Sequence, residues 1–298
     1  MPEDQDDLHA RAWRALMSPV PADKAAFTGR LFDDWGAGRL VVPDASPCPV
    51  LAVDDPGRPE RPELIAHTAV VRRKPVSPEG RAALLHAIAH IEFNAINLAL
   101  DCVYRFRGLP AEFYADWLRV AAEEAYHFGL LSERLDASGF AYGDFPAHRG
   151  LWDMAVKTAA DPLARMALVP RVLEARGLDA TPPIIASLRR VGDEATIAVL
   201  DIILRDEIGH VEVGNRWYKH LCQQQALEPV ATARQLALRY RAPAQHGPFN
   251  LVARLQAGFS ASEIARLEGV KPQKGSESTK KGWSKPLFFM TARRACAP

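Results

Sequence analysis

The sequence predicts an all-α fold, and three observations support this prediction. Apolar residues recur at helical spacing in the segment RAALLHAIAHIEFNAINLALDCVYRF, residues 81–106. A second long helix is expected from about Asp193 to Cys222. No stretch of the chain shows the strict apolar–polar alternation that is typical of a half-buried strand. With 298 residues, 48% of them hydrophobic, the chain is long enough to bury a sizeable core.

Local start and stop signals place the individual helices. Ser77 followed by Pro78 combines a hydroxyl N-cap with a proline at the first helical position, and the helix that begins there stops at Gly108-Leu109-Pro110. Pro170 predicts a kink or a bulge inside the helix that begins at Asp161. The other helices or helical turns are expected at residues 10–17, 21–35, 110–135, 151–159, 181–183 and 193–222.

These elements suggest a central bundle with two extensions. We interpret residues 77–224 as a four-helix bundle with one long crossover, the connection at 139–161. Residues 1–76 form an N-terminal extension that is partly irregular, and residues 225–298 form a C-terminal extension. In FSASEIARLEG, Ser260 and Glu263 predict a capping box that starts a short helix, and the Lys/Ser/Gly-rich residues 271–285 predict a flexible basic arm.

Charge and cysteine content exclude several classes of protein. The formal net charge is +1, so no overall field favours nucleic acid or a membrane, although the basic end of the chain is weakly compatible with nucleic acid. The four cysteines form no C-x-x-C pair, which excludes a zinc ribbon, a rubredoxin-type site and a thioredoxin motif. We find no signal peptide and expect no membrane-spanning segment, and therefore predict a reduced, cytoplasmic protein.

Two Glu-x-x-His pairs are the first candidates for chemistry. Of the nine histidines, only His127 and His210 have a glutamate three residues earlier, Glu124 in EEAYH and Glu207 in DEIGH. Residues three apart lie on one face of a helix, so each pair can reach a single metal ion. One such pair alone is weak evidence, because surface pairs of this kind are common.

Two further glutamates lie in apolar surroundings. Glu92 is placed between Ile88, Ile91 and Ala95, and Glu174 lies in ALVPRVLEARG. A lone carboxylate buried at either position would cost several kcal/mol to desolvate, so both call for a common partner.

The spacing joins these residues into two matching halves. The offset along the chain from Glu92 to Glu174 differs by a single position from the offset between the two Glu-x-x-His pairs. In the first half, Glu92 lies nearly as far before Gly108 as Glu124 lies after Pro110. The two lengths correspond to about 24 and 21 Å of helix, so the two glutamates of an antiparallel hairpin meet at similar height.

The six residues match a known ligand set of helical bundles. Di-iron and di-manganese carboxylate bundles use one glutamate from each of two helices and one Glu-x-x-His from each of the other two. Four carboxylates balance two divalent ions, and oxygen-rich ligands with two imidazoles suit iron or manganese. The sequence therefore predicts two iron ions, with manganese or a mixed Mn/Fe pair as alternatives, bound by six ligands: Glu92, Glu124, His127, Glu174, Glu207 and His210.

The same blocks resemble known families. EFNAINLALD, EEAYH, LEARG and DEIGH resemble the ferritin-like superfamily. HAIAHIEFNAINLALD, YGDFPAHRGLW, ARMALVPRVLEARGLDATP and DEIGHVEVGNRWY resemble the bacterial family named domain of unknown function 455, over roughly residues 60–260. The superfamily resemblance implies that Glu124 and Glu207 bridge the metals, that Glu92 and Glu174 are terminal ligands, and that each histidine binds one metal.

Neighbouring polar residues have two interpretations each. Glu123 and Asp206 stand four residues before His127 and His210, and they either orient the imidazoles or face solvent. His90, His86 and His148 are better explained as structural residues than as ligands. Tyr104 and Tyr126 are better explained by packing than by redox chemistry.

Four functions remain open at this stage. The first is an O₂-activating oxidase or hydroxylase with an external electron donor, acting on a small organic molecule or RNA. The second is metal storage or detoxification, against which the long extensions on both sides of the bundle argue. The third is removal of peroxide. The fourth is a metal-free binding module, to which GFSASEIARLEGVK, similar to the start of a helix-turn-helix, gives weak support. A homodimer is compatible with any of the four.

Overall fold

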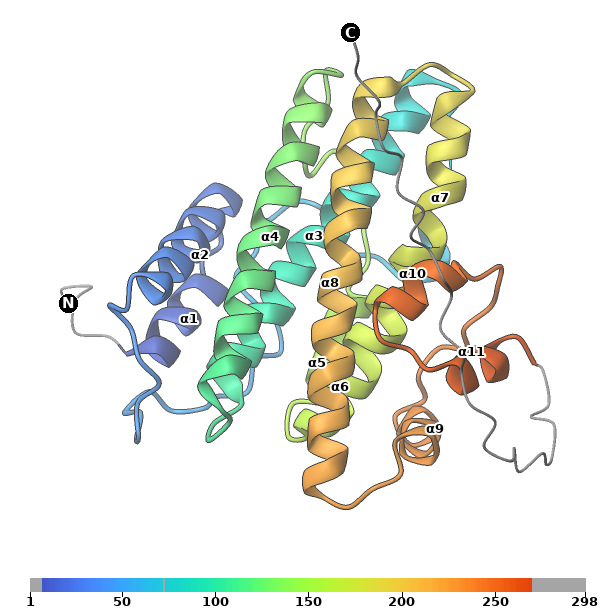
Figure 1. Ribbon diagram of the computed structural model, residues 1–298. Coiled ribbons are helices and arrows are strands. Elements are labelled where there is room, and N and C mark those ends of the chain that lie inside the picture. The colour runs from blue at the N-terminus through green and yellow to red at the C-terminus, as the bar shows by residue number, and fades with distance from the viewer. Residues whose placement is uncertain (1–6, 72, 270–298) are drawn as a thin grey trace, which may run out of the picture.

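We describe the fold from a computed structural model in which residues 7–71 and 73–269 are placed. The fold is all-α, as predicted: the described residues contain no strand, and their single isolated β-bridge joins Leu64 to Ala147. The helices run as long columns in the centre and as shorter pieces on two flanks (Figure 1). The basic run at 271–285 lies outside the described residues.

Helices α3 (Pro78–Arg105) and α4 (Ala111–Asp136) form an antiparallel hairpin. The Ser77 hydroxyl accepts a hydrogen bond from the Gly80 amide, so the predicted N-cap is confirmed. The turn between the helices contains Gly108, whose φ of +69° lies in the left-handed region that glycine adopts most easily. This hairpin brings Glu92 on α3 next to α4.

The return through the second half is one continuous helical segment over residues 162–189. It consists of α6 (Pro162–Leu168), a π-helical turn η3 (Val169–Glu174) and α7 (Ala175–Arg189). The bulge predicted at Pro170 is confirmed as this π-helical turn. Glu174 is the last residue of η3, so the wider turn decides where its side chain begins.

The helix does not stop at Pro182 and Pro183, and the expectation of a separate turn there is wrong. Both prolines lie inside α7. Pro182 has no amide hydrogen to donate to the carbonyl of Leu178, four residues earlier. The Asn250 side-chain amide donates to that carbonyl instead, at 3.2 Å. A residue far away in the sequence therefore compensates for the proline.

Helix α8 (Glu194–Gln224) forms a second hairpin with the segment α6–η3–α7, and it also lies beside α4. The Asp193 carboxylate caps its first turn by accepting from the Thr196 amide. Deeper in the molecule, the Arg165 guanidinium on α6 donates to the Asp101 carboxylate on α3 at 2.7 Å, and both side chains are 1% exposed. This ion pair joins α3 of the first hairpin to α6 of the second.

Shorter helices cover the flanks. Helices α1 (Leu8–Leu16) and α2 (Pro21–Gly36) pack on α3 and α4, and α5 (Gly150–Lys157) lies between the hairpins. Helices α9 (Pro229–Arg239), α10 (Leu251–Gln256) and α11 (Ala261–Leu267) lie on the side of α6 to α8, and α11 has the predicted capping box. A short 3₁₀ turn covers His67–Ala69. The division at residues 76 and 224 stays a prediction.

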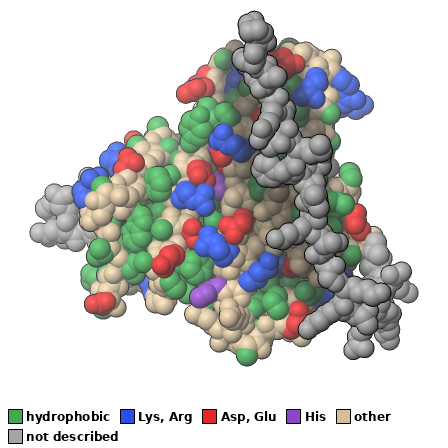
Figure 2. All heavy atoms as spheres, in the orientation of Figure 1, with side chains coloured by type: hydrophobic (Ala, Val, Ile, Leu, Met, Phe, Trp, Pro, Cys, Tyr) green, Lys and Arg blue, Asp and Glu red, His purple; other side chains and the backbone are tan. Residues whose placement is uncertain are grey.

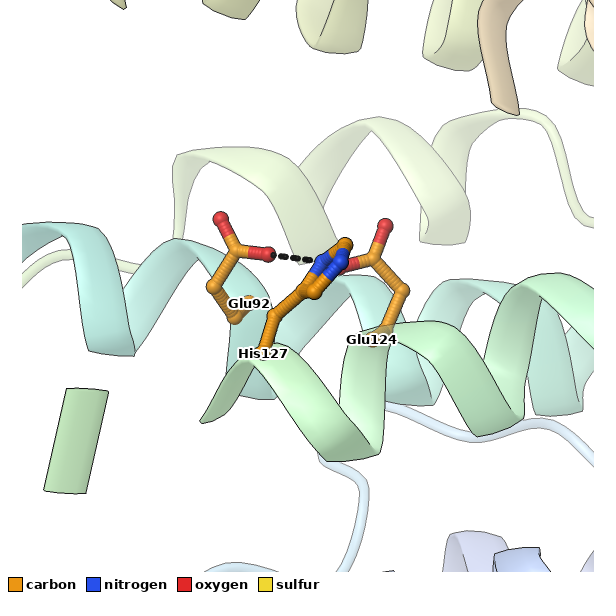
Figure 3. A group of neighbouring side chains, drawn as sticks. All are labelled: Glu92, Glu124 and His127. Atoms are coloured by element: carbon orange, nitrogen blue, oxygen red, sulfur yellow. Dashed lines mark hydrogen bonds and ion pairs between the residues drawn. The ribbon is translucent and has the colours of Figure 1, made fainter. Parts of the chain in front are cut away.

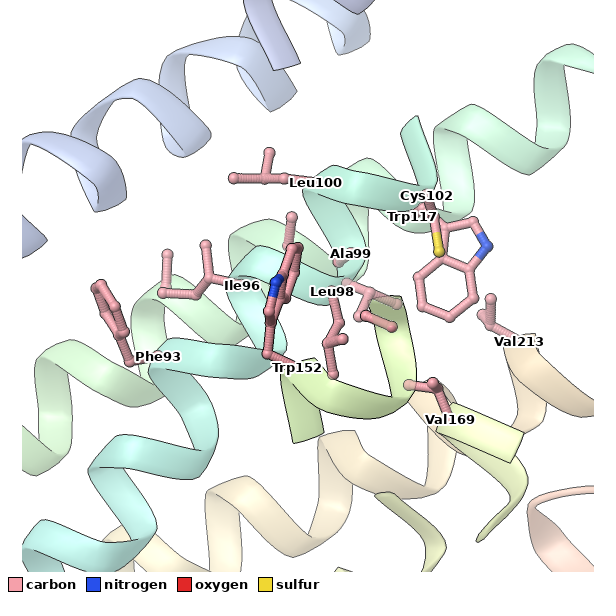
Figure 4. Packing of buried hydrophobic residues seen from close by; sticks show 14 of the residues in the cluster. Phe93, Ile96, Leu98, Ala99, Leu100, Cys102, Trp117, Trp152, Val169 and Val213 are labelled. Atoms are coloured by element: carbon pink, nitrogen blue, oxygen red, sulfur yellow. The ribbon is translucent and has the colours of Figure 1, made fainter. Parts of the chain in front are cut away.

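The hydrophobic core runs between the hairpins. Trp152 on α5 packs beside Ile96 and Leu98 of α3, and Val169 and Val213 approach each other from η3 and α8 (Figure 4). Helix α3 is long and apolar enough to cross a membrane by length and composition alone. Most of its apolar window is buried inside the protein, which is also typical of a core helix in a soluble protein.

Candidate metal centre

Two buried triads of carboxylate and imidazole groups lie in the middle of the hairpins. The first consists of Glu92, Glu124 and His127, and the second of Glu124, Glu207 and His210. Within each triad, one ligand atom from every residue lies within 4.8 Å of the others. Glu124 belongs to both, so the two triads form one connected site. Figure 3 shows Glu92 on α3 pointing toward the His127 ring on α4.

In the first triad, the inner nitrogen of His127 faces two carboxylates. Nδ1 lies 3.2 Å from Glu92 Oε2 and 3.6 Å from Glu124 Oε2. All three side chains are at most 3% exposed. The second triad repeats this arrangement. His210 Nδ1 lies 2.9 Å from Glu124 Oε1 and 3.9 Å from Glu207 Oε1. Glu124 therefore turns one carboxylate oxygen toward each histidine.

The outer nitrogens of the two histidines are held by acids from the opposite hairpin. His127 Nε2 lies 3.1 Å from Asp206 Oδ2 on α8, and His210 Nε2 lies 2.7 Å from Glu123 Oε2 on α4. An N–H that donates outward from Nε2 leaves the Nδ1 lone pair free to bind a metal. Glu123 and Asp206, expected as orienting acids or as solvent-facing residues, thus contact the histidines in a crossed pattern.

Arginines on the surface hold these two acids. Arg205 donates to both oxygens of Asp206, at 2.8 and 3.0 Å, and Arg119 lies 3.4 Å from Glu123. On the face shown in Figure 2, basic and acidic side chains mix across the middle of the molecule, over α4 and α8. The histidines are therefore one carboxylate away from solvent on this side.

Glu174 is the predicted ligand that the structure leaves outside both triads. Its side chain is buried, and its Oε2 has no hydrogen bond within the part of the chain that the structure describes. Glu207 and Glu124 are close enough to raise its pKa. Glu207, for its part, belongs only to the second triad, so Glu124 alone has the shared position that the resemblance implied for both.

The acid–base properties of the cluster reflect burial and charge crowding. Burial, with help from nearby glutamates, raises the pKa of Glu92 well above its ordinary range and that of Glu174 to about 8. For His127, burial lowers the pKa, but the nearby carboxylates of Glu124 and Glu92 outweigh it and raise the pKa to about 11. The attraction of the nearby His210 and His127 rings outweighs burial at Glu124 and lowers its pKa. The raised pKa values of Glu174 and His127 favour the protonated forms of both side chains, which reduces the repulsion among the buried carboxylates.

Several buried atoms in the cluster form no hydrogen bond with any residue that the structure describes. They include both oxygens of Glu124, Glu207 Oε2 and His210 Nδ1. His210 Nδ1 and Glu124 Oε1 are 2.9 Å apart but lack the alignment of a hydrogen bond. Donor atoms that share an ion at about 2.1 Å in octahedral geometry lie about 3.0 Å apart, close to this spacing. The donor set therefore fits divalent metal ions.

The other candidate residues, His90, Tyr104 and Tyr126, lie outside the two triads. The His90 ring accepts from Tyr142 at Nδ1, donates to the His148 carbonyl, and burial lowers its pKa to about 4. The Tyr104 hydroxyl donates to the Pro49 carbonyl, 2.8 Å away. Tyr126 on α4 is 54% exposed.

A small cavity lies beside α3, and no triad residue lines it. Its lining includes Asn97, Tyr142 and Trp152, and its volume is about 20 Å³. A single water needs about 10 to 15 Å³ on this scale, so the cavity suits one or two waters and not an organic substrate. Both polar atoms of the Asn97 side chain are buried without a partner among residues 7–71 and 73–269, and such waters would satisfy them.

Sequence reasoning missed residues that support the site from behind. The Asp101–Arg165 pair and the Arg171–Asn215 bond, at 2.6 Å, join separate elements, and no local pattern marks either pair. Gly214 is a partial exception. A glycine in the middle of a long predicted helix signals a close approach, and a Cβ there would lie 2.3 Å from the Pro170 ring.

Comparisons with known proteins now add the family. A protein of Haemophilus influenzae (strain ATCC 51907 / DSM 11121 / KW20 / Rd), described as an uncharacterized protein, is 51% identical over 259 residues, which cover 84% of this chain and 90% of the relative. No solved structure matches significantly. The family model described as a protein of unknown function (DUF455) matches residues 17–265. The chain therefore belongs to the DUF455 family.

Proposed function

We propose that this protein binds a dinuclear iron or manganese centre and uses it as an O₂-activating oxidase or hydroxylase. The observation that carries the proposal is the shared position of Glu124, with one oxygen turned toward each histidine. A carboxylate placed in this way is suited to bridging two ions. The ferritin-like resemblance of the sequence blocks supports the same interpretation.

The remaining ligands follow from the two triads. Glu92 and His127 would hold one ion, and Glu207 and His210 would hold the other. Glu174, on η3, would be the sixth ligand, because its buried Oε2 has no other partner in the described part of the chain. Oxygen and imidazole donors favour iron or manganese over metals that prefer thiolates.

The residues around the centre keep it dry and ordered. Bound in this way, two metal ions would supply open coordination positions and the change of oxidation state that O₂ or peroxide reduction needs. His127 and His210 are fully buried, so bulk water does not compete at their inner nitrogens. Asp206 and Glu123 fix the tautomers of the two rings through Nε2. An external donor would return the electrons.

Metal analysis of purified variants tests the proposal directly. Glu124→Ala removes the shared ligand, so we expect the metal content to fall from two ions per chain to less than one. Glu133→Ala is the matched control, because Glu133 lies on the same helix but is exposed. Equal metal content in Glu124→Ala and wild type would contradict the proposal.

The type of reaction requires a second experiment. Protein loaded anaerobically with Fe²⁺ should consume O₂ and should do so repeatedly only when a reductant is supplied. Rapid loss of added hydrogen peroxide without a reductant would instead favour peroxide removal. A particle of 24 subunits on gel filtration would favour storage, which the short helices that flank α3, α4, α6 and α8 disfavour.

A further inference from the structure

We propose that residues 250–263 form a clamp on η3 that sets the position of Glu174. The positioning residues are Arg254 and Glu263 of the clamp and Arg171 of η3. The inference rests on the proposed function, because it assigns a role to the ligand that stands apart from the triads. The clamp consists of α10, the start of α11 and the turn between them.

Glu174 depends on its backbone more than the other ligands do. Its Oε2 has no hydrogen bond within the described part of the chain, so no contact at the tip of the side chain fixes it. It is the last residue of the π-helical turn η3. A π-helical turn is rare, and contacts with neighbouring groups are needed to stabilise it. Whatever holds η3 therefore holds this carboxylate.

One arm of the clamp reaches η3 three residues before Glu174. The buried Arg171 guanidinium donates to Asn215 on α8 at 2.6 Å and forms an ion pair with Glu263 on α11. It also lies over the Tyr218 ring, 4.2 Å from the centroid. The Asn215 amide in turn donates to the Ala257 carbonyl at 2.6 Å. Arg171 thus links η3 to α8 and to α11 at the same time.

The second arm holds the chain on the other side of Glu174. Arg254 on α10 is fully buried and donates to the Asp179 carboxylate at 2.6 Å and to the Ala175 carbonyl at 3.4 Å. Asn250 donates its side-chain amide to Leu178 and its backbone amide to Asp179. The chain is therefore held through side chains three residues before and five residues after the ligand, and through backbone carbonyls one and four residues after it.

The chemistry of these contacts indicates a role in geometry more than in stability. A buried ion pair often stabilises a fold no better than apolar side chains of similar size would. A planar guanidinium held by several acceptors, however, fixes direction as well as distance. Two such arginines on either side of one unsupported carboxylate fit a positioning role.

Glu263→Gln is the most informative variant. Glutamine can still accept from the Ser260 amide, so the capping box and α11 are preserved, but Arg171 loses its negative partner. We expect Mn²⁺, titrated into metal-free protein and followed through the EPR signal of the free ion, to show about tenfold weaker binding of one of two ions. Amide hydrogen exchange at residues 171–175 of the metal-free variant should also become faster.

Two variants control for effects on the fold. Glu212→Gln breaks an exposed glutamate–arginine contact on α8, at 3.3 Å from Arg216, and should leave Mn²⁺ binding unchanged. Ser260→Ala removes the cap of α11 but keeps Glu263 opposite Arg171, so it should weaken binding less than Glu263→Gln does. Circular dichroism of each variant should show unchanged helix content.

The outcomes separate the clamp from the metal proposal. If Glu174→Ala weakens Mn²⁺ binding and Glu263→Gln does not, the clamp is wrong and the metal centre stands. If Glu174→Ala and Glu124→Ala both bind Mn²⁺ as wild type does, the metal centre itself is wrong. Weaker binding in both Glu174→Ala and Glu263→Gln, with intact controls, supports the clamp.

Discussion

At the scale of single residues, the protons of the metal-free cluster determine how the site responds to pH. Glu174 has a pKa raised to about 8 and His127 one raised to about 11, so both hold protons at neutral pH. A metal ion must displace these protons before it binds the same atoms. Metal and proton therefore compete.

We expect the affinity for Mn²⁺ to rise between pH 6 and pH 8. The sign follows from the displacement: below the pKa of its group, each proton that the metal releases on binding raises the affinity about tenfold per pH unit. Calorimetric titrations in two buffers of different ionisation enthalpy would count the protons. Affinity that stays constant over this range would show that the cluster binds no metal through these groups.

The buried Asp101 carboxylate allows a prediction about stability. Asp101→Asn leaves Arg165 charged and 1% exposed without its anion, and breaking a buried pair in this way costs about 3 to 5 kcal/mol. Asp153→Asn breaks the half-exposed pair with Arg149 and should cost at most about 1 kcal/mol. Urea unfolding of both variants would measure the difference, and equal losses would contradict the assigned role of burial.

At the scale of elements, α8 packs directly against η3 at Gly214. A Cβ added there would lie 2.3 Å from the Cβ and Cγ atoms of Pro170, so one of the two elements must move. We expect Gly214→Ala to lower the free energy of unfolding by about 1 to 3 kcal/mol. Gly209→Ala is the control on the same helix, because the nearest atom is 3.9 Å away. It should be neutral or stabilise by up to about 1 kcal/mol.

The positions of the helices could be predicted from the sequence because their signals are local. Ser77, Asp161 and Asp193 cap the helices that they were expected to start. The continuation of α7 through Pro182 could not be predicted, because the group that satisfies the freed carbonyl, on Asn250, is distant in sequence.

For the candidate site, the residue spacing identified which side chains meet but not how they meet. The nearly equal offsets of the two halves predicted that Glu124 and both histidines lie close together, and the two triads confirm this. The crossed contacts of Glu123 and Asp206 depend on the packing of α4 against α8. The separate position of Glu174 depends on the π-helical form of η3, and Pro170 indicated a kink or a bulge there but not which of the two forms.

At the scale of the whole molecule, a bound metal should stabilise the fold. Four buried carboxylates repel one another without an ion, and a ligand that binds only the folded state adds about 4 kcal/mol at a thousandfold excess over Kd. We expect removal of metal with a chelator to lower the Tm by roughly 10 °C, and added Mn²⁺ to restore it. Glu124→Ala is the control, because its Tm should respond to neither treatment.

The contacts of Asp206 with His127 and of Glu123 with His210 would be lost if the chain were split into its two hairpins. A hairpin of α3 and α4 alone would contain His127 but not Asp206, and the other hairpin would contain His210 but not Glu123. Each half therefore lacks the acid that contacts the outer nitrogen of its own histidine, and the other half supplies that acid. Two separately expressed hairpins would have to associate before either imidazole could make its Nε2 contact, so we expect both contacts to form together or not at all.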